Sequence, residues 1–362
     1  MLDFLYEQPL KTVIIGDVRL TPETMEAALK NSPIKMREVS HVFWGEKEDT
    51  GAFSVRQLNL ERNGSDAEPY APELDEAILD AELIMVHMCP IPQKLLEKAK
   101  NLRAILICRG GVENVNAACA GELGIPVINV IRNAVSVAEF ALGLILSATR
   151  NIAESHHQIR SGVWTRDYPN ADYIRTLENL TVGLVGVGNM GIELATRLKA
   201  LNVPMKFYDE YINRERLKTS GLGDVEVVDS LDTLFRECDI ISLHLRLTEE
   251  NVGQINARYF EQMKPTAYFV NTARGGLINQ DDLVSVLKAK KIAGAALDVF
   301  DSEPLRKDSG LAELDNVVLT AHIAGTTYDA LNNSPVQLLR EVDRIVKNGA
   351  TERIVNYRQL SL

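Results

Sequence analysis

The chain has 362 residues, too many for one comfortable hydrophobic core, so its length predicts two domains. Hydrophobic residues make up 46% of the chain and charged residues 25%, as in an ordinary soluble globular protein. The net charge of -11 at pH 7 argues against a nucleic-acid partner, because binding to a phosphate backbone needs clustered lysines and arginines.

The cysteines and the first residues indicate the compartment. No two of the four cysteines have C-x-x-C spacing, so we expect reduced, unpaired thiols and a cytoplasmic protein. The opening residues, MLDFLYEQPLKTV, mix acids with apolar residues and predict no signal peptide. The longest apolar run, residues 140–146, is far shorter than the ~20 residues that cross a bilayer. We therefore expect no membrane contact. We also expect no metal site.

Strand and helix patterns alternate in the first third of the chain. Thr21 followed by Pro22 predicts the start of a helix that reaches Leu29. Residues 45–73 are polar and rich in Gly, Asn, Asp, Glu and Pro, so we expect a surface connection there. Strands are expected at 12–15, 83–86, 104–108 and 127–130, and a short helix at 93–100.

An apolar helix is expected from Ser136 to Arg150. Its residues are apolar nearly all round, so the helix must be buried on several sides, either between domains or in a subunit contact. A polar helix over 151–164 and a connection over 165–178 follow it.

Residues Leu180 to Asp209 carry the pattern around which the rest of the chain is organised. A β-branched strand over 181–185 leads into G-x-G-x-x-G spacing, and helical apolar spacing follows over 192–201. The first glycine permits a tight turn, the second lets the backbone approach a pyrophosphate, and the third lets helix pack on strand. The turn comprises Gly186, Gly188, Asn189, Met190 and Gly191. This order of elements predicts a dinucleotide site.

Asp209 ends the next expected strand, Met205 to Tyr208. An acid roughly 20 residues beyond the glycine turn binds the ribose hydroxyl groups of the adenosine. Because a carboxylate would repel a 2′-phosphate, Asp209 favours NAD over NADP as the cofactor. Arg214 and Arg216 follow closely and leave NADP as the alternative.

Beyond Asp209 strands alternate with helices or loops, which predicts a parallel, doubly wound α/β sheet. An amphipathic helix, Pro335 to Val346, has no strand partner nearby in sequence, so we expect it to pack back on the first domain. That domain is then discontinuous, with boundaries 1–133 and 326–362, and the second domain spans 134–325. The remaining strands are expected at 240–243, 267–271, 293–299 and 317–320.

Ligands of open α/β sheets bind at the carboxyl ends of the strands. There a histidine can exchange a proton near neutral pH, an arginine can hold a carboxylate through two hydrogen bonds, and an acid can favour the charged histidine. His322, Arg274 and Glu303 are the candidates for these roles, although His322 alone reads as structural and Glu303 alone as a solvated loop acid. The other residues expected at this edge are His244, Thr272, Ala273 and Asp298.

Five motifs occur in an order that resembles the D-isomer-specific 2-hydroxyacid dehydrogenases, the family that includes phosphoglycerate dehydrogenases. The motifs are GVGNMG, SLHLRLTEEN, MKPTAYFVNTARGGLIN, GAALDVFDSEP and LTAHIAG, and the resemblance covers residues 83–346. It implies a Rossmann NAD-binding domain and a discontinuous, flavodoxin-like substrate domain. It also implies an NAD-dependent oxidoreductase that interconverts a D-2-hydroxy acid and the matching 2-oxo acid.

The resemblance assigns roles by position. Arg274 in NTARGG matches the substrate-binding arginine, His322 in AHIAG the proton donor and acceptor, and Glu303 in SEP the acid paired with that histidine. Asp298 matches a residue near the nicotinamide carboxamide. The helix over 136–150 resembles the one through which the family commonly dimerises, so a homodimer is expected.

In the first domain, RGGVENVN resembles the loop whose amides hold the substrate carboxylate, here Arg109, Gly110 and Gly111. His87 and Arg109 end neighbouring strands, so a second anionic group of the substrate, such as a phosphate, is a hypothesis. The plainer interpretation is a packed strand-end histidine and an arginine that shapes the loop.

Four positions depart from the family pattern. Arg246 stands where most relatives have proline and places a cation near the adenosine side, either touching the cofactor or simply solvated or bridging the domains. The others are Asn116, Phe140 and Ala321. None removes a catalytic group, but together they indicate a divergent branch and weaken any transfer of substrate identity.

Two alternatives remain. A nucleotide-sensing regulator of the co-repressor kind shares this fold and the three candidate residues, although the chain ends soon after its last helix, without a long interaction tail. Formate dehydrogenase is also similar, but it has glutamine where Glu303 stands. No regulatory domain follows the dehydrogenase part, so we expect no effector control of the kind seen in some phosphoglycerate dehydrogenases.

Overall fold

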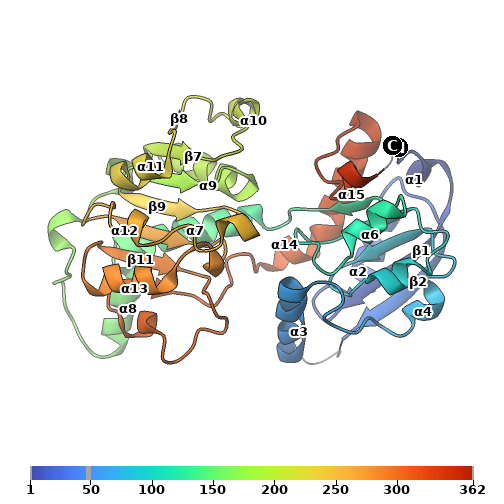
Figure 1. Cartoon of the computed structure of the whole chain (residues 1–362), viewed down its shortest axis with the longest axis horizontal. Helices are drawn as coiled ribbons and strands as arrows, with labels where there is room; N and C mark the ends of the chain where they lie inside the picture. The colour runs from blue at the N-terminus through green and yellow to red at the C-terminus, as the bar shows by residue number, and fades with distance from the viewer. Residues whose placement is uncertain (1, 46–49, 361–362) are drawn as a thin grey trace. The chain divides into compact units, whose positions relative to one another are not determined.

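The computed structural model describes residues 2–45 and 50–360. The chain forms two compact units (Figure 1). Unit 1 comprises Met1–Asn133 and Thr327–Leu362, and unit 2 comprises Ala134–Thr326. Each unit is built on a parallel β-sheet with helices on both faces, the α/β class predicted from the alternation of strands and helices.

The sheet of unit 1 has five strands in the order β2-β1-β3-β4-β5. All neighbouring strands run parallel, and this order is that of the flavodoxin-like folds. The short strands are buried and, apart from Asn129 in the last of them, apolar, as expected where helices cover both faces of a sheet. The strands are β1 Leu10–Asp17, β2 Met36–Trp44, β3 Leu83–Val86, β4 Ala104–Ile107 and β5 Val127–Asn129.

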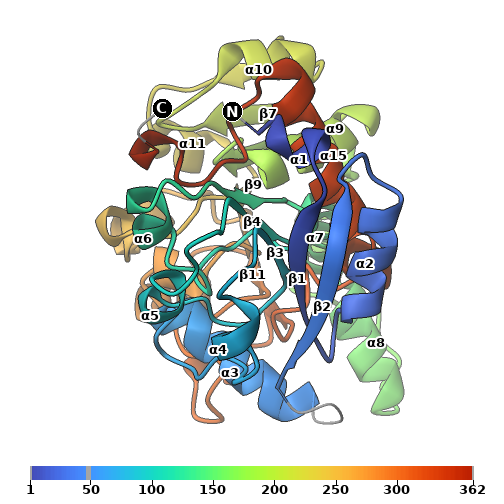
Figure 2. The same cartoon turned by 90° about the vertical axis from the view of Figure 1, so that its right-hand side faces the viewer.

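Helices cover the two faces of this sheet. Figure 2 shows α2 and α15 on one side of β1 and β2, and α4 to α6 on the other. The apolar side chains of these helices form two separate cores with the strands, one on each face. The helices are α1 Phe4–Glu7, α2 Pro22–Lys30, α3 Thr50–Asn63, α4 Leu74–Ala77, α5 Gln93–Leu96, α6 Ala117–Glu122, α14 Tyr328–Asn332 and α15 Ser334–Asn348.

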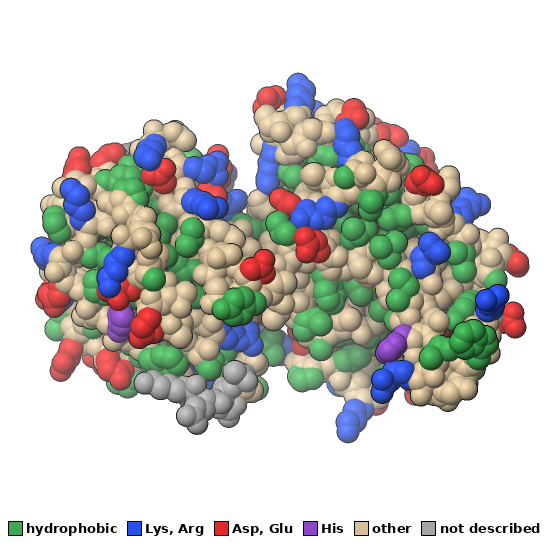
Figure 3. All heavy atoms as spheres, turned by 180° about the vertical axis from the view of Figure 1, so that it is seen from behind, with side chains coloured by type: hydrophobic (Ala, Val, Ile, Leu, Met, Phe, Trp, Pro, Cys, Tyr) green, Lys and Arg blue, Asp and Glu red, His purple; other side chains and the backbone are tan. Residues whose placement is uncertain are grey.

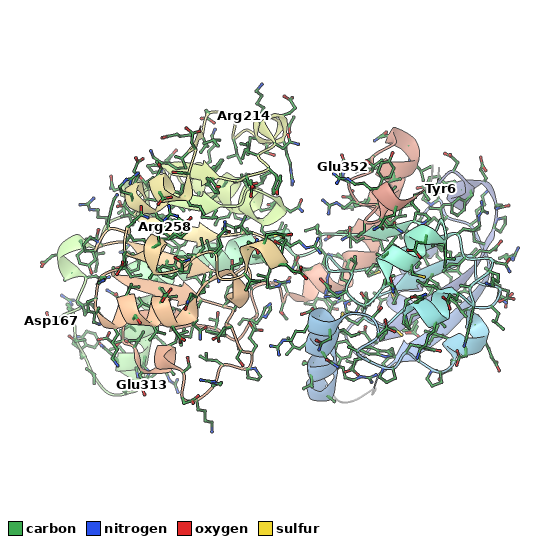
Figure 4. All side chains as sticks on the ribbon, viewed as in Figure 1. Tyr6, Asp167, Arg214, Arg258, Glu313 and Glu352 are labelled. Carbon is green, nitrogen blue, oxygen red and sulfur yellow. The ribbon has the colours of Figure 1, made fainter. Side chains whose placement is uncertain are left out.

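The long helix α15 returns to unit 1 from the far end of the chain. Leu338 and Val342, both fully buried, pack into the core that also holds Leu10 and Met25. The Tyr6 hydroxyl of α1 (labelled in Figure 4) donates to Oδ1 of Asp343 at 3.0 Å. The strongly amphipathic sequence of α15 therefore completes a face of a sheet whose strands lie more than two hundred residues earlier.

The sheet of unit 2 has seven strands in the order β12-β11-β10-β9-β6-β7-β8. Counted within the unit, this is the Rossmann order with one strand added at an edge, and every neighbouring pair is parallel. The strands are β6 Val182–Val185, β7 Met205–Tyr208, β8 Glu226–Val227, β9 Ile240–Leu243, β10 Tyr268–Asn271, β11 Gly294–Leu297 and β12 Val317–Leu319.

Two layers of helices enclose this sheet. The apolar sides of α7 and α9 pack on one face, and those of α11, α12 and α13 pack on the other. The apolar helix expected over 136–150 is α7, which contacts α9 and strands β10 to β12. The helices are α7 Ala134–Thr149, α8 Ile152–Arg160, α9 Asn189–Ala200, α10 Arg214–Thr219, α11 Leu231–Glu237, α12 Ala257–Phe260 and α13 Gln280–Lys288, with short 3-10 turns at 171–173, 177–179, 249–251, 275–277 and 310–313.

The expectation of a plain surface connection over residues 45–73 was wrong. Within the described residues this stretch contains the fourteen-residue helix α3, and the expected strands omitted β2 just before it. Few apolar residues mark α3, but Phe53 and Leu60 are fully buried, and Phe53 packs edge-on against Trp44 at 5.7 Å between ring centroids. Tertiary contacts, which a local pattern does not show, therefore decide this helix.

Two expected helices are shorter than predicted. The helix over 93–100 is helical only in α5, Gln93–Leu96, and that over 151–164 ends with α8 at Arg160. In the described residues no single helix is long and apolar enough to cross a membrane; α7 and α8 reach that length only as a pair bent by 66°.

We expect the substitution Leu338→Ala to destabilise unit 1 by about 2–5 kcal/mol, because it leaves a cavity in a fully buried core. Trp44 lies in unit 1 and Trp164 in unit 2, so Trp44 fluorescence in a Trp164→Phe background reports the unfolding of unit 1 in denaturant. The matched control is Val336→Ala on the same helix, where the side chain is 42% exposed and the loss should stay below about 1 kcal/mol. Equal losses in both variants would show that α15 does not complete this core.

Candidate active site

The carboxyl ends of the strands of unit 2 gather the residues singled out in its sequence. Strand order reverses between β6 and β9, and such a switch point is where open α/β sheets bind ligands. The glycine turn follows β6, His244 follows β9, Thr272 to Arg274 follow β10, and Asp298 follows β11.

The glycine turn is shaped by three different local requirements. Gly186 has φ +91°, and a Cβ there would lie 2.9 Å from the carbonyl carbon of His244. A Cβ on Gly191 would lie only 2.2 Å from the Gly186 carbonyl oxygen, so α9 can approach β6 only with glycine at this position. A Cβ on Gly188, by contrast, would meet no atom of the described chain within 4 Å. The second glycine therefore faces open space beside the N-terminus of α9, where a pyrophosphate would bind.

Asp209, at the end of β7, ties this turn to the neighbouring strand. Its Oδ2 accepts a hydrogen bond from the Val187 N–H at 2.8 Å, and its Oδ1 accepts one from the Tyr211 N–H at 2.9 Å. Asn189 begins α9, and its Oδ1 accepts from Nη2 of Arg216 at 2.7 Å. Met190 lies beside it in the first turn of α9, partly exposed. The expected acid and the glycine turn thus lie together, with a cation nearby.

His244 and Thr272 supply polar groups at the ends of the two central strands. Nε2 of His244 lies 2.9 Å from the Ser242 hydroxyl, and burial lowers the pKa of His244 to about 4. The ring is therefore neutral at pH 7. The Thr272 hydroxyl is buried without a hydrogen-bond partner within the described chain. Burying such a group costs about 1–3 kcal/mol unless a ligand satisfies it.

Arg274 lies on a loop whose close approach to a neighbouring loop requires a glycine. A Cβ on Gly275 would lie 1.9 Å from the Phe300 backbone, so this loop can lie against the loop after β11 only without a side chain there. Asn271 fixes the loop, because its side-chain amide donates to the Arg274 carbonyl and its Oδ1 accepts from the Ala273 N–H. The Arg274 guanidinium is exposed and bonds only the Ala273 carbonyl, at 2.7 Å, among the described residues. Only Nη1 makes this bond, so the three N–H groups on Nε and Nη2 of Arg274 remain available to a ligand.

His322 and Glu303 form a hydrogen-bonded pair. Nδ1 of His322 lies 2.7 Å from Oε2 of Glu303, whose Oε1 accepts from the Phe300 N–H at 3.0 Å. The bond to Glu303 raises the pKa of His322, although burial opposes this shift. Burial acts to raise the pKa of Glu303, but the bonds from His322 and the Phe300 N–H lower it overall. Both pKa values also respond to the charge of Arg274, so the three groups lie within electrostatic reach of one another.

Asp298 holds the loop that carries His322. Its carboxylate, fully buried, accepts hydrogen bonds from the Thr320 hydroxyl and from the N–H groups of Ile323 and Ala324. Its carbonyl accepts from the His322 N–H at 2.8 Å. His322 itself has φ +53°, a conformation that non-glycine residues rarely adopt and that such surrounding bonds must maintain. Asp298 therefore fixes the backbone conformation of the loop that carries His322.

The remaining candidates make no hydrogen bond or ion pair with this group among the described residues. The side chain of Arg246 is exposed and has no hydrogen-bond or ion-pair partner in the described chain. His87, Arg109, Gly110 and Gly111 belong to unit 1. The N–H groups of Gly110 and Gly111 donate to no other group of the described chain, so they remain available to a carboxylate.

Sequence reasoning missed three residues at the carboxyl edge of unit 1. Asp17 ends β1 and Arg19 follows it, and Arg132 follows β5; His87 bonds Asp17, with 2.7 Å between Nδ1 and Oδ2. The available signal was their position, because Asp17 and Arg19 lie two and four residues after the expected strand 12–15, and Arg132 lies two residues after the expected strand 127–130. Over the described residues, no group of three or more His, Cys, Asp or Glu side chains could hold a metal ion.

Comparisons with known proteins place this geometry in context. Residues 142–324 match the sequence profile described as "D-isomer specific 2-hydroxyacid dehydrogenase, NAD binding domain". A glyoxylate reductase of Thermofilum pendens is 36% identical over 81% of this chain and 87% of its own length. A D-3-phosphoglycerate dehydrogenase of Archaeoglobus fulgidus is 35% identical over 78% of this chain, but the chain spans only 53% of that relative.

Solved structures share the fold at lower identity. A D-isomer specific 2-hydroxyacid dehydrogenase of Lactobacillus delbrueckii in an NAD-complexed form is 22% identical, with a TM-score of 0.71 over 95% of this chain and 99% of that one.

We expect Glu303→Gln to lower the pKa of His322, because the neutral amide no longer stabilises the imidazolium. A pH titration of the imidazole resonances by NMR, assigned with His322→Gln, measures the change. Since the folded pKa of His322 is raised, the pair stabilises the fold below the unfolded pKa, and this contribution disappears as the pH rises through the folded value. In the variant that pH dependence should shrink.

The matched control is Glu313→Gln, an exposed acid on the 3-10 turn Gly310–Glu313 of the same unit (Figure 4). An identical titration of His322 in the wild type and in Glu303→Gln would contradict the assigned electrostatic coupling.

Proposed function

Because the chain belongs to the family of D-isomer-specific 2-hydroxyacid dehydrogenases, whose members are NAD-dependent oxidoreductases, we propose that it interconverts a D-2-hydroxy acid and the matching 2-oxo acid. The observation that carries this proposal is the hydrogen bond between Nδ1 of His322 and Oε2 of Glu303, with Arg274 within electrostatic reach. This arrangement brings a histidine that can exchange a proton and an arginine that can bind a carboxylate to the edge where the sheet binds its ligands.

The residues of unit 2 fit NAD, the cofactor of this family. The open space beside Gly188, the free N–H groups at the start of α9 and the unpartnered Thr272 hydroxyl provide a cradle and hydrogen-bonding groups. Asp209 would bind the ribose hydroxyls, and His244, Ala273, Arg246 and the rest of the glycine turn would line the same site. When bound, NAD supplies the acceptor or donor of a hydride.

His322 would move the proton of the reaction. Oxidation of a hydroxyl to a carbonyl removes one hydride and one proton, and Nε2 of His322 would accept the proton. This nitrogen is available because Nδ1 is engaged by Glu303, and Nε2 has no partner in the described chain. In the reductive direction the imidazolium would donate the same proton, and Glu303 would stabilise its charge.

Arg274 would hold the substrate. Its exposed guanidinium can bind a carboxylate through two parallel hydrogen bonds, and this fixes the angle at which C2 presents its hydrogen. Correct orientation of reacting groups is worth several kcal/mol of the barrier. In unit 1 the free N–H groups of Gly110 and Gly111 are proposed to bind a carboxylate, and His87 and Arg109 are proposed as substrate-binding residues.

The identity of the acid is the finer part of the proposal. The relatives are named for small oxo acids without phosphate, glyoxylate and hydroxypyruvate, or for the phosphorylated 3-phosphoglycerate. A 3-phosphoglycerate-like acid is therefore one candidate, supported by the basic residues near His87, and an unphosphorylated acid is the other.

We also propose a homodimer formed through α7. One side of this helix packs on the sheet, whereas Phe140 and Leu142, which flank that side, are only partly buried and Val135 is 47% exposed. Figure 3 shows hydrophobic side chains gathered on this face of unit 2. All four cysteines are buried free thiols, which supports a reducing compartment such as the cytoplasm.

The test is a steady-state assay of NADH oxidation with a panel of 2-oxo acids, applied to the wild type and His322→Gln. We expect turnover of at least one acid by the wild type and a loss of about 10²–10⁴-fold in kcat in the variant, because the general acid is gone. NADH binding, measured by calorimetry, should be retained.

The control for this variant is His41→Gln, at a half-buried surface position of unit 1, which should leave kcat unchanged. Binding of NADH without turnover of any acid would instead favour a regulator. Loss of NADH affinity in His322→Gln would indicate a structural histidine.

A pair of glycine substitutions tests the cofactor cradle. Gly188→Ala adds a methyl group that meets no protein atom within 4 Å, so folding should be unaffected while NADH affinity falls by about 10-fold or more. Gly191→Ala places its methyl group against the Gly186 carbonyl and should lower the melting temperature instead. Unchanged NADH affinity in Gly188→Ala would show that the pyrophosphate does not approach this glycine.

A further inference from the structure

The glycine turn of unit 2 has no positively charged side chain of its own. Residues 186–191 read GVGNMG, and the Asp209 carboxylate is bonded to this turn through the Val187 N–H at 2.8 Å. The pyrophosphate of NAD carries two negative charges, whereas the N-terminus of a helix supplies only about half a positive charge. The Asp209 carboxylate adds a further negative charge. The turn therefore needs a cation from elsewhere in unit 2 to balance the ligand that it is shaped to hold.

Arg216 of α10 brings a cation to the start of α9. Its Nη2 donates to Oδ1 of Asn189 at 2.7 Å, and Asn189 is the first residue of α9, directly after Gly188. The N–H groups of Asn189 and Met190 in this first turn donate to no group of the described chain. The guanidinium is therefore held beside the helix end at which a pyrophosphate binds.

The described chain leaves the charge of Arg216 without a counter-ion. Among the described residues its side chain bonds only the neutral amide of Asn189, so its Nε and Nη1 keep three N–H groups for a ligand. Arg197, further along α9, is by contrast paired with Glu193 at 2.7 Å. Arg246 is unpaired like Arg216, but no bond among the described residues holds it near the glycine turn. Arg216 is thus the cation that the fold fixes at this place.

The backbone that carries Arg216 is anchored independently of its side chain. Helix α10 begins after Asn213, whose Oδ1 accepts from the Arg216 N–H at 2.9 Å. The next residue, Leu217, is 3% exposed and packs into the core formed with α7 and α9. Replacement of the Arg216 side chain therefore leaves both anchors of the helix in place. Arg214, labelled in Figure 4, lies in the same helical turn, and its side chain has no partner in the described chain.

We propose that Arg216 binds the pyrophosphate of the cofactor and that Asn189 positions its guanidinium for this contact. A planar guanidinium binds two phosphate oxygens through paired hydrogen bonds. The inference rests on the cofactor site of the proposed function, but not on the acid that is turned over. The rival ligand is the 2′-phosphate of NADP, which an arginine near the ribose-binding acid can accommodate. The pyrophosphate is the better match, because Arg216 bonds the first residue of α9 and makes no bond to Asp209.

Calorimetric titrations of the full chain with NADH, NADPH and ADP at low ionic strength test this contact without turnover. In Arg216→Gln we expect the affinities for NADH and for ADP to fall by about 10-fold, because a charged hydrogen-bonding group is lost. The affinity for NADPH should fall by the same factor. The melting temperature should stay that of the wild type, since neither anchor of α10 involves this side chain. The matched control is Arg214→Gln, which removes the same charge from the same helical turn and should change each affinity by less than about 2-fold.

Two further measurements separate a direct contact from a structural effect. Raising the salt concentration from about 20 to about 300 mM should weaken NADH binding less in Arg216→Gln than in the wild type or in Arg214→Gln, because one charge pair fewer is screened. Asn189→Ala keeps the cation but removes its anchor, so NADH affinity should fall by about 2–3-fold. The double variant Asn189→Ala/Arg216→Gln should bind NADH as tightly as Arg216→Gln alone, because the two side chains act as one unit.

Three outcomes would overturn the inference. They are equal NADH affinities in the wild type and Arg216→Gln, equal losses in Arg216→Gln and Arg214→Gln, and a loss confined to NADPH, which would instead assign Arg216 to the 2′-phosphate. Each of them leaves the proposed function standing. A wild-type protein that binds no NADH would remove the proposed function together with this inference.

Discussion

The candidate site depends on the buried carboxylate of Asp298. A fully buried charge is stable only when hydrogen bonds surround it, and Asp298 accepts three from the loop after β12. Those bonds force the loop to turn at His322 with a positive φ, and this turn presents the imidazole to Glu303. The pKa of His322 is thus raised by a partner that the fold, not the substrate, puts in place. The position of the loop and of the His322 imidazole therefore depends on one buried carboxylate and its hydrogen bonds.

The two units apply the same physical arrangement to different sheets. In each, a strand-end acid fixes other groups at the switch point: Asp209 ties down the glycine turn of unit 2, and Asp17 bonds His87 in unit 1. The difference lies in what remains unsatisfied. Unit 2 leaves an open glycine and a free threonine hydroxyl, which suit a nucleotide, whereas unit 1 leaves guanidinium groups, which suit an anion. Each sheet edge is thus characterised by its unsatisfied polar groups.

Much of this arrangement could be predicted from the sequence, because it depends on local pattern. The glycine spacing, the apolar strands and the strand-end polar residues each follow from neighbours along the chain, and the α/β class and the family follow from them. Helix α3 could not be predicted in this way, since Phe53 and Leu60 gain their burial from Trp44 and other distant residues. Arg19 and Arg132 were missed for a related reason. Only the packing of β1, β4 and β5 in one sheet brings their charges together, and the sequence does not show which cations lack a partner.

The return of α15 to unit 1 constrains the order in which the two units can fold during synthesis. Unit 2 is continuous in sequence, so its sheet can form as soon as its residues leave the ribosome. Unit 1 begins first but finishes last, because the apolar face around Leu10 and Met25 stays uncovered until Leu338 and Val342 are synthesised. During that interval the nascent chain exposes an apolar surface on the incompletely folded unit 1, and such a surface promotes aggregation. Chaperone demand should therefore depend on how fast unit 2 is translated.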